Sequence, residues 1–450
     1  MEKGKTLRAI IGALSILVVM LGGGAVAAPA QSAPAAGAAT NVTASQEQRA
    51  AGWRPVYGAT FNHARSTKAD MWRIENQILQ GINHAHKGSY IRISLFSFDR
   101  MPLTDALIRA KKRGVRVQVI LNNHQINGAM RKLKSALGTN RRKPSWYHIC
   151  VGSCRATFEN LHTKMVLFGY TGTVKNVVMT GSFNFTANAA VNQHNDLYTV
   201  WNKPNMYRDF LGLYRQLKAD RALPARKQHY IKQAGMWQLE VLPLPNWNVK
   251  NDPQMREMRK IRCTGASRST GNGRGRTKVR VAMHTISGKR GVWLAKKTRQ
   301  LFAQGCDIRI WYSWADRQTR NVFATRTARG YIPVHVAGYD TDYDGEIDLY
   351  GHHKVLLVSG NYAGRNNSNA VFTGSSNWGN AGLRGDEIIV RLMGSSLFKD
   401  WNRNFDSIWY SHSYLAKYIP YRASTMLRSD TAWNAAKPEP ELTPPSDWEY

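Results

Sequence analysis

The chain has 450 residues and a formal net charge of +34 at pH 7, from 63 Lys and Arg against 29 Asp and Glu. This length allows two packed lobes or one large duplicated domain with a sizeable core. The charge predicts a surface that attracts polyanions such as nucleic acid, anionic lipid or wall polymers. A soluble basic protein whose charge serves no specific partner stays open as the alternative.

The N-terminus carries the pattern of an export signal. Basic residues at positions 3–8 precede an apolar run over 10–20, and small residues ending in Ala25-Val26-Ala27 follow. This order predicts a signal peptide over 1–27, its removal, and a secreted protein with a charge of about +32. A retained anchor is the alternative, but the run falls short of the about 20 residues that cross a bilayer. Residues 28–50 should form a flexible leader.

A repeated order of elements organises the rest of the chain. Each half reads as a strand, an amphipathic helix that ends at a glycine, and a second strand. The expected elements are 90–98, 103–113 and 115–121 in the first half, and 278–284, 292–303 and 307–311 in the second. The predicted class is therefore α/β, with two similar βαβ-rich halves of mainly parallel sheets flanked by helices. We expect a first half over 51–235, a second over 236–435, and a tail over 436–450.

Each half also carries a polar motif that could serve one reaction. In an extended strand, a His and a Lys two residues apart point to the same face, and a Gly-Ser-x-Asn turn adds a hydroxyl and a carboxamide. The two copies are His162, Lys164, Ser182 and Asn184 in the first half, and His352, Lys354, Ser375 and Asn377 in the second. Facing one another, they would supply a nucleophile, an acid and donors for developing charge, as a phosphodiester requires.

These motifs resemble the duplicated HxK(x)4D…GSxN motif of the phospholipase D superfamily, which implies a pseudo-dimer of two halves around one site. Its members include phospholipases, phosphatidyltransferases, endonucleases and tyrosyl-DNA phosphodiesterases. The chain departs at the motif aspartate, where it has Gly169 and Ser359. Members that resemble tyrosyl-DNA phosphodiesterases also lack this aspartate, so the departure blurs the subfamily. A degenerate, non-catalytic site stays open.

The resemblance implies roles for the site residues. His162 would attack phosphorus and His352 would protonate the leaving group, while the two Lys and the two Asn hold the phosphoryl oxygens. Ser182 and Ser375 would line the turns, and no metal is required. Asp196 and Glu387 lie where family members carry a carboxylate that orients an imidazole. The alternative for these two is an ordinary acid at the start of a strand.

The remaining candidates are structural. Four cysteines in an exported chain allow three pairings, of which we favour Cys150–Cys154 and Cys263–Cys306. The run from 340 to 348 resembles the opening of a calcium loop, and its candidate ligands are Asp340, Asp342 and Asp344. Because position 12 of such a loop holds Gly351 instead of Glu, a solvated acidic turn is the favoured reading.

Substrate is suggested only in outline. A basic stretch over 131–143, followed by Trp146 and Tyr147, would suit either a phosphate backbone or an anionic membrane, or be a solvated loop. Aromatic residues near the motifs would cup a head group, stack on bases, or belong to the core; they are Trp311, Trp314, Tyr350 and Trp378.

We predict a secreted phospholipase D-type phosphodiesterase that hydrolyses phospholipids through a phosphohistidine. It would be a monomer with peripheral membrane contact, without a cofactor apart from the calcium candidate. The alternatives are a metal-independent nuclease of the same superfamily and a non-catalytic basic binding protein.

Overall fold

A computed structural model describes residues 52–416. The expected signal peptide (1–27), flexible leader (28–50) and tail (436–450) lie outside the described residues, as do residues 51 and 417–435 at the outer ends of the two expected halves. Among residues 52–416, no helix has both the length and the apolar character needed to cross a bilayer.

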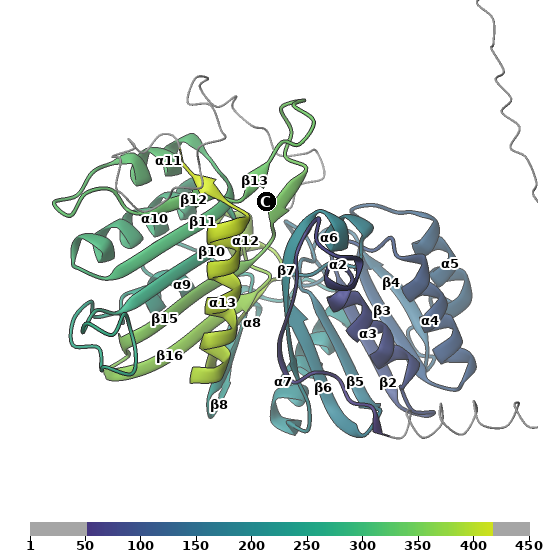
Figure 1. The fold of residues 1–450 in the computed structure, drawn as a ribbon. Helices are drawn as coiled ribbons and strands as arrows, with labels where there is room; N and C mark the ends of the chain where they lie inside the picture. Colours follow the sequence, from purple (N-terminus) through teal and green to yellow (C-terminus); the bar gives the residue numbers. More distant parts are fainter. Residues whose placement is uncertain (1–51, 417–450) are drawn as a thin grey trace, which may run out of the picture. The chain divides into compact units, whose positions relative to one another are not determined.

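The first half forms one nine-stranded sheet with its helices (Figure 1). Its strands are β1 (Gly58–Asn62), β2 (Tyr90–Leu95), β3 (Arg116–Asn122), β4 (Trp146–Cys150), β5 (Met165–Thr171), β6 (Val174–Gly181) and β7 (Gln193–Val200). Its helices are α2 (Lys68–Met71), α3 (Arg73–Asn83), α4 (Met101–Lys112), α5 (Gly128–Leu137), α6 (Ala187–Val191) and α7 (Pro204–Ala219). Two short strands from the second half, β13 (Gly338–Tyr339) and β14 (Leu349–Gly351), complete this sheet beside β7.

The second half repeats the arrangement in another nine-stranded sheet. Its strands are β8 (Tyr230–Ala234), β9 (Trp237–Val241), β10 (Lys278–Ile286), β11 (Asp307–Ala315), β12 (Val334–Val336), β15 (Lys354–Tyr362), β16 (Arg365–Gly374), β17 (Ile388–Met393) and β18 (Tyr414–Leu415). Its helices are α8 (Ala225–Gln228), α9 (Pro253–Met258), α10 (Gly288–Ala303), α11 (Arg317–Ala324), α12 (Ala381–Arg384) and α13 (Ser395–Ser411). The edge strand β8 comes from residues that the sequence assigned to the first half.

The predicted α/β class with two similar, helix-flanked halves is confirmed. Parallel pairing forms the βαβ units, in which β2, β3 and β4 run parallel, as do β10, β11 and β12, and it also joins β14 to β7. Antiparallel pairs make up the rest of both sheets. The HxK strands β5 and β15 then pair antiparallel with β2 and β10, and hairpins follow. A hairpin needs only a short turn, whereas a parallel connection needs a helix, so each half joins both patterns.

Three hydrophobic cores hold these layers together. One lies between the first sheet and α3 to α5, and a second lies between the second sheet and α9 to α11. The third is shared by both halves, because it combines apolar residues of both sheets with α7 and α13. The two halves are therefore packed as one body within residues 52–416.

Both favoured disulfides are formed, Cys150–Cys154 and Cys263–Cys306. The first closes the turn that follows β4, shortly before His162. The second ties the segment before β10 to the segment after α10.

Candidate active site

The two HxK pairs lie at the beginnings of equivalent strands. Lys164 directly precedes β5 and Lys354 begins β15, so each His lies just outside its sheet. All four residues are at most 5% exposed. Each ammonium donates to the backbone oxygen of its own histidine, at 3.2 Å for Lys164 and 2.8 Å for Lys354. Burial of two ammonium groups is costly unless they serve a charge nearby, which favours an anion-binding role.

Each imidazole is held by a side chain from the other half of the chain. His162 Nδ1 donates to Glu387 Oε1 at 2.8 Å, and His352 Nδ1 donates to Asn195 Oδ1 at 2.8 Å. In both cases Nδ1 carries the proton, which leaves Nε2 for chemistry. Backbone hydrogen bonds also join each histidine to the other half: His162 N donates to Asp386 O at 3.0 Å, and His352 N donates to the carbonyl of residue 194 at 2.8 Å.

The strand registers correct one of the expected roles. Gly181 pairs with Leu197, and Gly374 pairs with Ile389, so Asn195 and not Asp196 is the counterpart of Glu387. Glu387 contacts the imidazole of His162, as the resemblance implied.

Asp196 does not have the expected contact. It is fully buried and accepts hydrogen bonds from Thr373 Oγ1 and from Trp401 Nε1. Burial raises its pKa, against the hydrogen bonds from Thr373 and its other donors. Because side chains alternate along a strand, a step of one residue turns Asp196 away from His352 and toward Thr373 and Trp401.

The serines of the Gly-Ser-x-Asn turns form hydrogen bonds to Asn195 and to the backbone next to Glu387. Ser182 Oγ donates to Asn195 Oδ1 at 3.0 Å and accepts from Asp196 N at 3.0 Å. In the second half, Ser375 Oγ accepts from Ile388 N at 3.0 Å. Asn184 and Asn377 lie in the same turns and are buried. The serines thus position the groups behind the imidazoles.

Two aromatic rings that the sequence analysis missed flank the imidazoles. Phe96, after β2, lies edge-on to His162 with ring centroids 5.1 Å apart. His284, in β10, lies edge-on to His352 at 4.6 Å and stacks on Tyr350. Pairing of β2 with β5 and of β10 with β15 makes Phe96 and His284 equivalent positions. The sequence signal was their shared place at the end of the first βαβ strand.

The other aromatic candidates divide between site and core. Tyr350 is close to the site, and its hydroxyl accepts from Gln193 Nε2 at 2.7 Å. Trp311 and Trp378 are completely buried in hydrophobic cores, so they are core residues and do not cup a ligand. Trp314 is partly buried and packs beside Tyr350.

The positions of the missing motif aspartates are far from the imidazoles. Gly169 and Ser359 each lie five residues beyond the HxK lysine along an extended strand, which is about 16 Å. A side chain at Gly169 would meet Ser89 Oγ, and Ser359 Oγ accepts from Gly271 N at 2.9 Å. The departure from the motif therefore leaves the His, Lys and Asn groups untouched.

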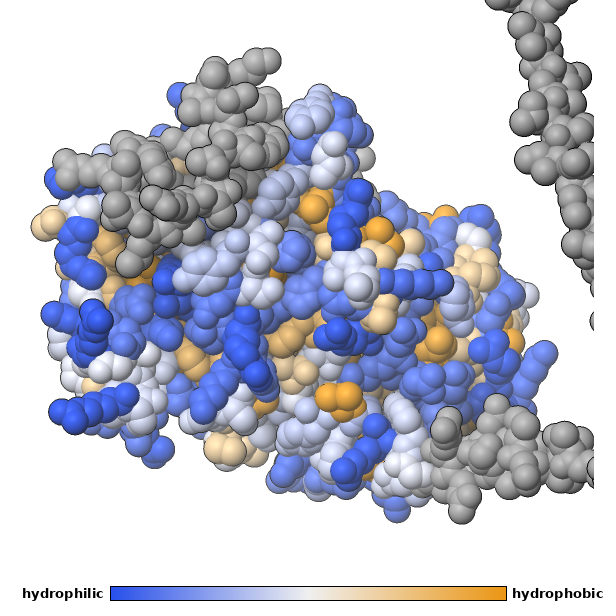
Figure 2. Space-filling model, in the orientation of Figure 1, coloured by the Kyte–Doolittle hydropathy of each residue, from blue (hydrophilic) through white to orange (hydrophobic). Residues whose placement is uncertain are grey.

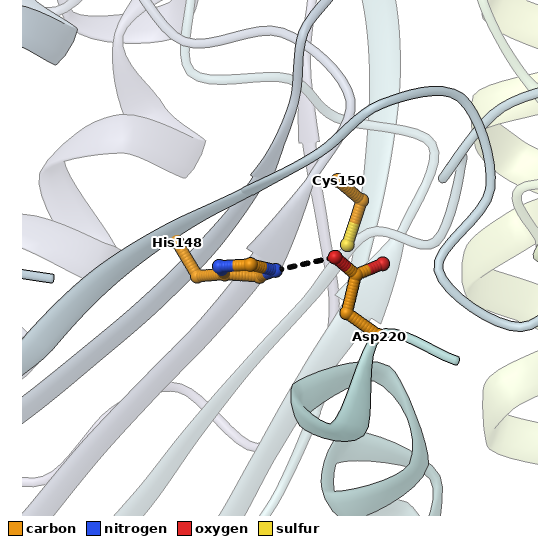
Figure 3. A group of neighbouring side chains, drawn as sticks. All are labelled: His148, Cys150 and Asp220. Carbon is orange, nitrogen blue, oxygen red and sulfur yellow. Dashed lines mark hydrogen bonds and ion pairs between the residues drawn. The ribbon is translucent and has the colours of Figure 1, made fainter. Parts of the chain in front are cut away.

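Within residues 52–416, two clusters have donor atoms close enough to hold a metal. The first is His148, Cys150 and Asp220, in which His148 Nε2 lies 2.8 Å from Asp220 Oδ2 (Figure 3). Cys150 is bound to Cys154, so it offers no thiolate. We therefore assign no metal to this group.

The second cluster lies in the calcium-like loop and consists of Asp340, Asp342 and Asp348. The predicted Asp344 is replaced by Asp348 in this set. The Asp344 carboxylate instead accepts from Glu346 N at 2.8 Å. A carboxylate trio suits calcium chemically, and a calcium site here stays a prediction.

The basic stretch has no single face of aromatic and basic residues. Arg131, Lys132 and Lys134 lie on α5, where Lys132 pairs with Asp105 at 2.6 Å. Trp146 and Tyr147 are buried in β4, so they belong to the cores and stack on no external base.

Residues 78–216 match the family model described as "Cardiolipin synthase, PLD-like domain". This match confirms the resemblance to the phospholipase D superfamily that the two motifs indicated. No curated protein sequence matches the chain.

Among solved structures, phosphatidylserine synthase from Haemophilus influenzae is similar in fold, with a TM-score of 0.51, 12% identity, and coverage of 84% of this chain and 92% of that one. Nuc from Salmonella typhimurium, a phospholipase D family member, is 25% identical over 35% of this chain and 92% of its own, with a TM-score of 0.26. Polyphosphate kinase from Porphyromonas gingivalis is 14% identical over 77% of this chain, with a TM-score of 0.47, and the match spans only 50% of that kinase.

Proposed function

We propose that the protein is a phosphodiesterase that works through a phosphohistidine, and that its physiological substrate is a phospholipid. The observation that carries the proposal is that each imidazole is hydrogen-bonded by a side chain from the opposite half: His162 by Glu387, and His352 by Asn195. Export, expected from residues 1–27, belongs to the same proposal.

In the first step, Nε2 of His162 attacks phosphorus, and the bond from phosphorus to the leaving oxygen breaks. His352, entering the step protonated, donates its Nε2 proton to that oxygen, so an alcohol departs. In the second step, His352 takes a proton from water, the water oxygen attacks phosphorus, and the phosphorus–nitrogen bond breaks. The products are a phosphate monoester and the original enzyme.

The different partners of the imidazoles favour this assignment. Positive charge develops on the attacking ring, and the carboxylate of Glu387 stabilises it through the Nδ1 proton of His162. The carboxamide of Asn195 fixes the same tautomer of His352 but adds no negative charge. An imidazolium without a carboxylate partner gives up its proton more readily, which suits the acid that serves the leaving group.

Exposed apolar side chains near the site favour a lipid substrate. The loops that lead into the two HxK pairs expose Val151 and Tyr343, each 80% exposed, and Phe158, 58% exposed. Exposed apolar side chains on loops beside a site are suited to insertion at a membrane interface, and a basic protein is attracted to anionic bilayers. Together these features support docking of the site on a membrane.

Nucleic acid is the second candidate because of the net charge of +34. A polyanion would approach such a surface readily at low salt. In this case the exposed apolar residues would have no role in catalysis. A non-catalytic basic protein would instead show no turnover with either substrate.

The test is a substrate panel of phosphatidylcholine and phosphatidylglycerol vesicles, DNA and RNA, each in EDTA, with wild type and His162→Ala in parallel. We expect head-group release by wild type and none by the variant. Release of nucleotides without head-group release would replace the lipid proposal by the nuclease. Absence of turnover on every diester would contradict the enzymatic proposal.

A further inference from the structure

A polar groove lies at the end of the second sheet away from His162 and His352. Its volume is about 710 Å³. One wall is the loop 268–273, the other is the beginning of α13, and the floor comes from β10, β15 and β16. Figure 2 shows mostly hydrophilic residues over this part of the face, between the loop and the first turns of α13.

Hydrogen bonds and a disulfide hold the loop that forms the first wall in a fixed position. The sequence predicts an exposed Gly-, Ser- and Arg-rich loop over 264–277, but the structure fixes it to the sheet. Ser267 N donates to Asn366 O at 2.9 Å, and Gly271 N donates to Ser359 Oγ at 2.9 Å. The disulfide Cys263–Cys306 anchors its base. A loop held at several points keeps its groove without a ligand, which lowers the entropic cost of binding.

Of the residues that the structure describes, four cations and no carboxylate line this groove: Arg268, Lys278, Lys399 and Arg403. Among the described residues, only Arg403 of these four has an ion pair, with Asp400 at 2.5 Å. Asp307 and Asp406 lie near Lys278, but they pair with Arg280 and Arg309 respectively. Burial, followed by the charge of Arg280, lowers the pKa of Lys278. The groove therefore has uncompensated positive charge.

The missing motif aspartate explains why this charge is uncompensated. Ser359 is directly opposite Lys278 in the antiparallel pair of β15 and β10 and lies on the floor of the groove. Side chains opposite one another in such a pair are neighbours, so an aspartate at 359 would give Lys278 an internal partner. Serine keeps the hydrogen bond to Gly271 but leaves the lysine for an external anion.

We propose that this groove is a binding site for a polyphosphorylated anion, created by serine at the motif aspartate position. Guanidinium forks and ammonium groups are the usual ligands of phosphate oxygens, and the groove also offers the amides of Asn367, Asn369 and Asn402. Its volume exceeds what one phosphate fills, so it suits several phosphates together. The source is either a soluble polyphosphate or the head groups of anionic lipid.

The groove is separate from the proposed chemistry. Lys278 begins β10, whose other end holds His284 beside the catalytic His352, and six residues of strand span about 20 Å. Binding in the groove requires no turnover. Its failure and the failure of the proposed function are thus distinguishable.

The experiment titrates the full-length protein with tripolyphosphate by calorimetry at low salt, and sediments it with vesicles of phosphatidylcholine containing phosphatidic acid. The decisive variant is Ser359→Asp, and its matched control is Ser359→Asn, which has the same size but no charge. Lys399→Glu is a second variant on the exposed wall, with Lys112→Glu on α4 as its charge-matched control.

We expect two classes of tripolyphosphate site in wild type, one in the groove and one at the catalytic lysines. Ser359→Asp and Lys399→Glu should each weaken the groove class by about tenfold or more, whereas both controls stay within about twofold. Hydrolysis of bis(p-nitrophenyl) phosphate should be unchanged in all four. Loss of vesicle binding alone would assign the groove to lipid head groups, and loss of tripolyphosphate binding would assign it to a soluble anion. Equal binding of both probes by Ser359→Asp, Lys399→Glu and wild type would overturn the proposal.

Discussion

The half that carries His162 and the half that carries His352 place their histidines on the same scaffold, but the group that holds each imidazole differs. His162 has the carboxylate of Glu387, and His352 has the carboxamide of Asn195. The ring beside each also differs, with Phe96 on one side and His284 on the other. A duplicated backbone thus sets where the groups meet, while single differences between the copies give the two imidazoles different partners.

The largest expected effect concerns the two histidines themselves. His162→Asn removes the nucleophile and should abolish turnover of every substrate, by roughly four orders of magnitude or more. His352→Asn should abolish turnover of substrates with alkyl leaving groups but retain partial activity on a p-nitrophenyl phosphodiester, whose leaving group departs without protonation. Steady-state rates with both substrates test this contrast. Equal losses in the two variants on both substrates would remove the distinction between the halves.

The next effect concerns the group that holds His162. Glu387→Gln keeps a hydrogen-bond acceptor but removes the charge, so kcat should fall by about 10²- to 10⁴-fold with little change in KM. The control is Asp196→Asn, which alters a buried carboxylate that contacts Thr373 and Trp401 instead of an imidazole. If Asp196→Asn lowers kcat as much as Glu387→Gln at equal stability, the assignment of Glu387 is wrong.

Replacement of Asn195, the partner of His352, by aspartate should give both imidazoles a carboxylate partner. In Asn195→Asp, a carboxylate would stabilise the protonated form of His352 and shift the alkaline limb of the pH–rate profile to higher pH. The measurement is kcat against pH for the variant and for wild type. An unshifted limb would show that residue 195 does not govern the acid.

The smallest effect concerns the pH dependence of stability at Asp386, the residue that precedes Glu387. Burial raises the pKa of Asp386 to about 6, against the charge of Arg155. The folded protein then binds more protons than the unfolded chain between about pH 4 and pH 6, so this group's contribution to stability falls as pH rises through that window, by roughly 3 kcal/mol. Asp386→Asn should remove this slope, measured as the unfolding free energy from denaturant titrations at each pH. A slope unchanged in the variant would mean that another group is responsible.

Much of this site could be predicted from the sequence, because the motifs are local and repeated. The two HxK pairs, the GSxN turns and both disulfides were found from spacing and residue type, and the role of Glu387 came from the family resemblance. Asn195 was missed because Gly181 to Leu197 is one residue longer than Gly374 to Ile389. Aligning acid with acid therefore chose Asp196, and a one-residue step on a strand reverses the face.

The remaining features depend on strand pairing that no local pattern contains. His284 reaches the site only because β10 lies beside β15, and Ser359 opposes Lys278 for the same reason. The loop 264–277 has the composition of an exposed linker, yet its hydrogen bonds to Ser359 and to the chain at Asn366 give it a fixed place. Amino-acid composition indicates only local conformational preference, whereas the positions of His284, Ser359 and this loop follow from the pairing of strands that are far apart in the sequence.

The central claim is that one half supplies the nucleophile and the other supplies the acid. It is tested most directly by trapping the covalent intermediate with a ³²P-labelled p-nitrophenyl phosphodiester in His352→Asn, whose water activation is impaired, and mapping the label by mass spectrometry. The account predicts an acid-labile, base-stable phosphoryl group on His162 in this variant and no label in His162→Asn. Label on His352 in His162→Asn would contradict the assignment of the two halves.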